Sequence, residues 1–89
     1  MDKIKVLIAD DVSSIRTFIN YAISQNFPNV ETEKVTNGLD AKNKLEINQY
    51  DLVLCDWEMP QMPGIELLKW LRNHPTLNKT PFICLISLK

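Results

Sequence analysis

The stretch VLCDWEMPQMPG, residues 53–64, is an apolar run that stops abruptly at Asp56 and continues as a proline-rich loop. A carboxylate at the end of an apolar strand has two interpretations. A turn begins there, because Asp is favoured at the start of turns, or Asp56 is displayed at the edge of a sheet to do chemistry. Which interpretation applies depends on the structural elements that the rest of the sequence predicts.

Four segments have the composition of β-strands. Residues 3–9 and 82–87 are almost continuously apolar, which is typical of strands covered on both faces in a parallel sheet. Residues 51–56 have the pattern of the most central strand. Residues 30–36 alternate apolar or β-branched residues with charged ones, which predicts a strand near an edge.

Helical patterns separate these strands. The first helix is expected to start near Ser13 and to end in the segment 26–29, and its apolar residues recur at the spacing of an amphipathic helix. Two shorter helices are predicted over residues 39–47 and 64–73. Because parallel strands need right-handed crossovers, the alternating order predicts an open α/β sheet with helices on both faces.

The composition is that of an ordinary soluble globular protein of 89 residues, with 45% hydrophobic residues and a net charge of -1. We expect a single domain over residues 1–89. Scattered Lys and Arg residues argue against nucleic acid, and no apolar run approaches the roughly 20 residues of a membrane helix. Without a signal peptide, a cytoplasmic protein is expected, in which Cys55 and Cys84 are buried free thiols.

Acidic residues close two of the predicted strands. Asp10 and Asp11 end the first strand, Asp56 ends the third, and Glu58 follows just beyond. Ligands of open parallel sheets bind at the carboxyl ends of the strands. If these strands are neighbours, three carboxylates converge, and a hard divalent cation would relieve their repulsion. The pattern predicts a magnesium site beside a carboxylate that can be phosphorylated.

Each acidic residue also has a simpler explanation when it is taken alone. Asp10 or Asp11 could be only an N-cap for the first helix. Asp56 could only start a turn, and Glu58 could be a solvated loop residue. The acidic pair and the single Asp at two strand ends are harder to explain separately when they occur together.

These residues carry a family resemblance. The segments VLIADD, YDLVLCDWEMPQMPG and TPFI, together with an Asn-Gly followed by a short helix, resemble the CheY-like receiver domain of two-component response regulators. The resemblance extends from Lys3 to about Ser87. It implies a flavodoxin-like, doubly wound parallel sheet, here with four strands in the order 2-1-3-4 and three helices, lacking the family's helix four, strand five and helix five.

The resemblance also implies roles for individual residues. Asp56 would be the phosphoacceptor, taking a phosphoryl group from a phosphohistidine on a sensor histidine kinase or phosphotransfer protein. Asp10, Asp11, Asp56 and the backbone carbonyl of Glu58 would bind Mg²⁺. Gly64 matches the glycine that opens the third helix. Such a chain is a signalling phosphoacceptor domain, and its only phosphoryl transfer is directed to itself.

One departure from the family concerns the switch residue. The family places Thr or Ser at the end of strand four, where the hydroxyl binds the phosphoryl group. The aligned position here is Ile86, and Ser87 follows one residue later. Because a one-residue slip reverses side-chain direction in a strand, Ser87 is a poor substitute. Lys89 does not occupy the position of the family's phosphate-contacting Lys.

A second expectation concerns association. Without further elements beyond it, strand four would be an exposed apolar edge, which invites pairing with another chain. We therefore expect a homo-oligomer through this edge. The alternative function is a phosphorylation-impaired receiver fragment that acts only as an interaction or dimerisation module. A small metal-dependent phosphatase with Glu58 as general acid is a third hypothesis, but 89 residues leave no room for a substrate cap.

Overall fold

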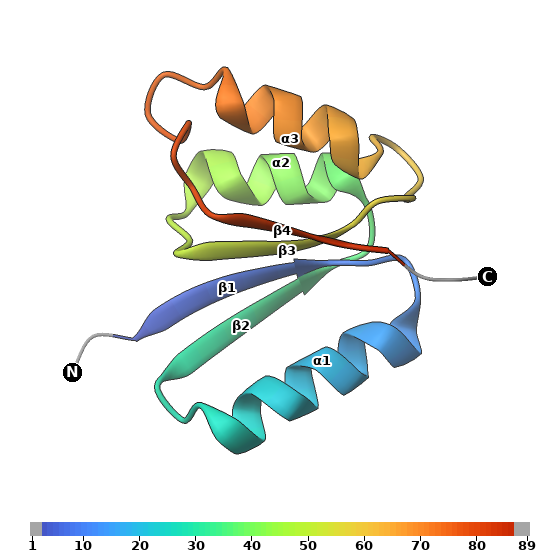
Figure 1. The fold of residues 1–89 in the computed structure, drawn as a ribbon, viewed down its shortest axis with the longest axis vertical. Helices are drawn as coiled ribbons and strands as arrows, with labels where there is room; N and C mark the ends of the chain where they lie inside the picture. Colours follow the sequence, from blue (N-terminus) through green and yellow to red (C-terminus); the bar gives the residue numbers. More distant parts are fainter. Residues whose placement is uncertain (1–2, 87–89) are drawn as a thin grey trace.

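The computed structural model describes residues 3–86, which form a four-stranded parallel sheet with helices on both faces (Figure 1). In chain order the elements are β1 (Ile4–Ala9), α1 (Ser13–Asn26), β2 (Val30–Val35), α2 (Gly38–Ile47), β3 (Leu52–Asp56), α3 (Gly64–Arg72) and β4 (Phe82–Leu85). Every predicted element is present, and the ends differ from the predicted ends by at most two residues. The predicted α/β class is confirmed.

The strand order is β2-β1-β3-β4, with all neighbours parallel. This is the order 2-1-3-4 that the family resemblance implied. The strand β1 lies between β2 and β3, and its last residue, Ala9, is in register with Cys55. The residues that follow, Asp10 on one strand and Asp56 on the other, therefore emerge side by side at the carboxyl edge of the sheet.

The hydrophobic core lies between the sheet and the helices α2 and α3, which share one face (Figure 1). Its largest fully buried members on this face are Leu7, Val53, Cys55, Leu67 and Leu71. Burial of an aliphatic side chain of this size contributes about 1.5–3 kcal/mol each. This face holds the fold together and fixes the start of α3, which the loop after β3 must reach.

The opposite face carries only α1 within residues 3–86 (Figure 1). The amphipathic pattern correctly predicted this helix, yet none of its residues is buried, and Phe18 is 69% exposed. A single helix is too narrow to cover a four-stranded sheet. Apolar hollows consequently remain beside α1. One of about 300 Å³ lies between Ile23 of the helix, Phe27 just after it, and the strand residues Leu52 and Leu54.

The two cysteines lie opposite each other on β3 and β4 as free thiols. Cys55 is buried, as expected, whereas Cys84 is only half-buried. Burial, with a smaller contribution from Cys84, raises the pKa of the Cys55 thiol to about 12. The core thiol is therefore protonated and unreactive at neutral pH. None of the helices described between residues 3 and 86 is long and apolar enough to span a membrane.

Candidate functional site

The first strand delivers Asp10 to the carboxyl edge of the sheet. Its side chain is only 4% exposed, and its Oδ1 accepts a hydrogen bond of 2.8 Å from the backbone N–H of Val12. The Arg16 guanidinium donates to the Asp10 carbonyl oxygen at 2.7 Å. The N-cap of α1 is Val12, without a side-chain cap bond. The simpler explanation of Asp10 or Asp11 as an N-cap is therefore wrong.

The third strand ends at Asp56, which is 6% exposed. Its Oδ1 accepts from the backbone N–H of Glu58 at 3.3 Å, so Asp56 does begin a turn. The same side chain also faces the acidic pair. The two interpretations of Asp56 are thus compatible, because one carboxylate has oxygens for both purposes.

Asp10, Asp11 and Asp56 each present a carboxylate oxygen, and these oxygens all lie within 4.8 Å of one another. Asp11 is exposed to solvent, whereas the other two are buried. The predicted convergence of the three carboxylates is confirmed. Oxygen ligands at this spacing are the kind that a hard divalent cation such as Mg²⁺ prefers.

The electrostatics of the cluster favour such a cation. Burial raises the pKa of the Asp56 carboxyl, and the negative charges of Asp10 and Asp11 raise it further. The Glu58 N–H acts in the opposite direction, because it bonds to the charged form. The charged form of Asp56 is therefore disfavoured without a cation, and a positive charge beside it would offset that cost.

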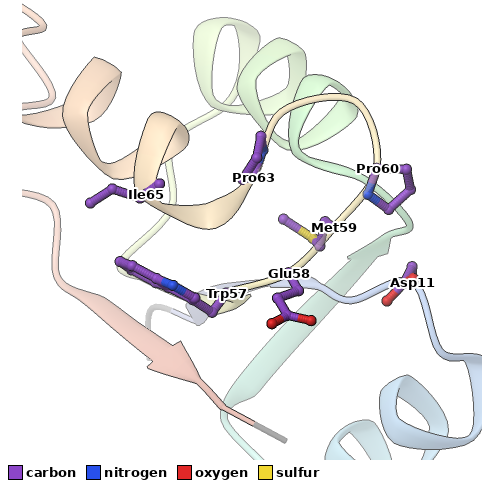
Figure 2. Close-up of a pocket in the computed structure, with 7 residues that line it drawn as sticks. All are labelled: Asp11, Trp57, Glu58, Met59, Pro60, Pro63 and Ile65. Carbon is purple, nitrogen blue, oxygen red and sulfur yellow. The ribbon is translucent and has the colours of Figure 1, made fainter.

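The loop between β3 and α3 forms one wall of a groove of about 470 Å³ beside the acidic cluster. Figure 2 shows the exposed Glu58 carboxylate lying between Trp57 and Asp11 in this view. The remaining lining residues are Met59, Pro60, Pro63 and Ile65. The sequence analysis did not predict this groove. In the sequence, the groove is indicated by the concentration of Trp, Met and Pro directly after Asp56.

The loop leads into α3 as the sequence predicted. Helix α3 begins at Gly64, and Pro63 stands at its N-cap with its carbonyl accepting from the N–H groups of Glu66 and Leu67. A Cβ at Gly64 would lie 2.6 Å from the Asp56 carbonyl oxygen. Only glycine permits this close approach, so Gly64 lets the helix start directly against the strand end.

Ile86 directly follows β4 and is 76% exposed. It stands at the place where the family resemblance leads one to expect a hydroxyl. Ile86 lines a largely apolar cavity of about 260 Å³ together with Asp10, Asp56 and Leu85. An isoleucine there cannot donate a hydrogen bond to a group on Asp56. Ser87 and Lys89 lie outside the described residues.

Fold and site together define a doubly wound α/β domain whose acidic cluster lies at the carboxyl ends of its two central strands. The sequence model of the response regulator receiver domain family matches residues 6–89. The chain belongs to this family and is a receiver domain of two-component signalling.

Individual relatives agree with this assignment. The chain is 36% identical over 84 residues to the chemotaxis protein CheY-3 of Vibrio cholerae, covering 93% of this chain and 63% of CheY-3. The receiver domain of the Francisella response regulator 1452 superposes with a TM-score of 0.85 at 37% identity, covering 98% and 69% of the two chains. CheY4 of Vibrio cholerae gives a TM-score of 0.84 at 29% identity, covering 92% and 67%.

Proposed function

We propose that the chain is a phosphoacceptor module of a phosphorelay, in which Asp56 receives a phosphoryl group. The observation that carries this proposal is the convergence of three carboxylates within 4.8 Å at the carboxyl ends of β1 and β3. Its donor would be a phosphohistidine on a sensor histidine kinase or a phosphotransfer protein. Family membership supports this class of partner.

The residues suited to hold Mg²⁺ are Asp10, Asp11 and Asp56 through their carboxylates, and Glu58 through its backbone carbonyl. Bound there, the cation would neutralise charge that develops on the transferring phosphoryl group. The chain's own part is to keep the Asp56 carboxylate ionised and aimed outward. The Glu58 N–H donates to the Asp56 carboxylate. This bond favours the ionised form of Asp56 and also restrains the orientation of its side chain.

In the transfer step, an Asp56 carboxylate oxygen forms a bond to phosphorus as the phosphorus–nitrogen bond of the donor breaks. The imidazole leaves with the electron pair of that bond, and Asp56 becomes an acyl phosphate. Ile86 offers no hydrogen bond to the phosphoryl oxygens. We therefore expect phosphorylation that is slow, or short-lived, compared with a receiver that has Thr or Ser at this position.

The test uses the intrinsic fluorescence of Trp57, which directly follows Asp56, in a Trp70→Phe background. Mg²⁺ followed by beryllofluoride should change the Trp57 emission. Phosphoramidate with Mg²⁺ should add one phosphoryl group by mass spectrometry, and Asp56→Asn should abolish the addition. Asp51→Asn is a matched control, because Asp51 precedes the same strand at its opposite end and accepts from the Lys5 backbone N–H. A wild-type chain that takes up neither cation nor phosphoryl group contradicts the proposal.

An interaction module is the second candidate function, favoured by apolar surface at β4. This strand is an edge of the four-stranded sheet, and its Ile83 is 50% exposed. We propose that the 89-residue chain forms a homo-oligomer through this edge. Light scattering after size exclusion should then give a mass above that of one chain, and Ile83→Lys should lower it, since charge on an edge opposes pairing. A stable monomer at micromolar concentration contradicts this proposal.

A further inference from the structure

Both glycines of the chain lie in close contact with the backbone of the segment 56–62, which includes most of the loop after β3. Gly64 lies against the Asp56 carbonyl at the base of the loop. Gly38, the first residue of α2, lies against its tip. A Cβ on Gly38 would overlap the carbonyl oxygen of Met62 and lie 2.9 Å from the Met62 carbonyl carbon and Cβ. At this distance the loop, the helix or both would have to move.

A hydrogen bond accompanies this contact. The backbone N–H of Leu39 donates to the carbonyl of Gln61 at 2.8 Å. The first N–H groups of a helix have no partner within the helix, so the loop carbonyl satisfies one of them. A second is satisfied by Asn37, whose side chain accepts from the Asp40 N–H. The tip of the loop is therefore part of the capping of α2.

The tip of the loop is held in an unfavourable conformation. Gln61 and Met62 have φ angles of 52° and 98°, in the region that favours glycine. Residues other than glycine remain there only when their surroundings force them, at a cost on the order of 1–3 kcal/mol each. The contacts with Gly38 and Leu39, together with the packing of the Met62 side chain against the core, hold this tip.

The base of the same loop belongs to the acidic site. Glu58 lies two residues after Asp56 and donates its backbone N–H to the Asp56 carboxylate. The N–H of Gly64 donates to the Trp57 carbonyl at 3.1 Å, which closes the loop at its base. A short loop closed at its base and held at its tip has few ways to move one end without the other.

We propose that Gly38 is a positioning residue for the cation site. Its lack of a side chain lets α2 hold the loop tip in the geometry that presents the Glu58 backbone beside Asp56. This inference rests on the proposed function, because it concerns the same cation. The competing outcome is that Met59, which is anchored in the core between Glu58 and the tip, absorbs any displacement of the tip.

Gly38→Ala tests the inference against a matched control. Asn37→Ala removes the cap bond at the same end of α2, a loss of about 1 kcal/mol, but adds no bulk toward Met62. Each change is made in the Trp70→Phe background. We would measure unfolding by urea without metal and Mg²⁺ affinity from Trp57 fluorescence. We expect the Mg²⁺ dissociation constant to rise about tenfold in Gly38→Ala and less than twofold in Asn37→Ala.

Equal affinities in the two variants overturn the inference, whatever their stabilities. If Gly38→Ala does not fold, Leu39→Pro decides, because it removes the N–H that donates to the Gln61 carbonyl and adds no Cβ at Gly38. Proline is tolerated in the first turn of a helix, and the Leu39 side chain is exposed to solvent. A lower Mg²⁺ affinity supports the inference, and an unchanged affinity overturns it. Failure of the wild-type chain itself to bind Mg²⁺ would instead overturn the proposed function, so the two failures are distinguishable.

Discussion

The two faces of the sheet are built very differently. On one face α2 and α3 bury a contiguous core, in which Leu67 is fully buried. On the other face α1 contributes no buried residue, and its Phe18 is largely exposed. Helix α1 on the open face and α3 on the packed face both carry an amphipathic pattern in the sequence. Burial depends on what a helix packs against, and two adjacent helices enclose a side chain more completely than one.

The acidic site joins these two halves of the molecule. Asp10 and Asp11 lead directly into α1 on the open face, while Asp56 leads into the loop that packs with α2 and α3. The residues on the packed side are held by core contacts and loop closure. Those on the open side are held mainly by the turn bonds of Asp10 and by Arg16. Substitutions in the two halves, and the binding of a cation, are therefore expected to change the stability of each half by different amounts.

The largest expected difference is between a core substitution on the packed face and a substitution of an exposed apolar residue on the open face. Leu67→Ala should lower the free energy of unfolding by about 2–5 kcal/mol, because it leaves a cavity in the packed core. Phe18→Ala should lower it by less than about 1 kcal/mol, since its ring is largely in solvent already. Urea denaturation of both variants measures the contrast. Losses of equal size would mean that the Phe18 ring is covered in solution, for example by a second chain.

Cation binding should reduce the difference in local stability between the packed half and the open half. Mg²⁺ at one hundred times its dissociation constant should raise the free energy of unfolding by about 2.7 kcal/mol by mass action. Amide hydrogen exchange should show added protection in the first turn of α1, because the cation ties Asp10 and Asp11 to Asp56. A gain of stability that is retained in Asp56→Asn would place the cation elsewhere.

A smaller effect on stability is expected when Asp56→Asn removes the repulsion between Asp56 and the other two carboxylates. Since folding raises the pKa of Asp56, the native state holds this proton more tightly than the unfolded state. The metal-free protein should therefore lose stability as pH rises from about 4, the ordinary aspartate value, through the raised folded value. Asp56→Asn lacks this loss and should unfold at a higher temperature at pH 7, by about 4–8 °C if the gain is about 1 kcal/mol.

Thermal unfolding of wild type and Asp56→Asn between pH 4 and pH 8, with a chelator present, measures this effect. The gap between the two melting temperatures should widen as pH rises. A constant gap would show that the amide changes packing and not charge.

The smallest expected effect concerns a surface ion pair between α2 and the edge strand β2. The Nζ atom of Lys44 lies 3.3 Å from Oε2 of Glu33, and both side chains are partly exposed. Lys44→Met should change the free energy of unfolding by no more than about 0.5 kcal/mol. High salt should remove what difference there is. A loss above 1 kcal/mol would show that this end of the packed face depends on charge as well as on apolar contact.

Local patterns in the sequence determined the elements and their order. Alternation and apolar runs located all four strands, helical spacing located the three helices, and Gly64 marked the start of α3. The motif around Asp56 determined the family, and through it the strand order. These features depend on residues that are close together in the chain, so the sequence alone is enough to predict them.

Only the tertiary structure decided which distant groups meet. The pairing of β1 with β3 brings three carboxylates within 4.8 Å, and the packing of α2 brings Gly38 against Met62. It also left Phe18 exposed although its spacing predicted a buried stripe. Periodicity states which side of an element is apolar, but contacts between segments far apart in the chain arise from how complete layers fit together.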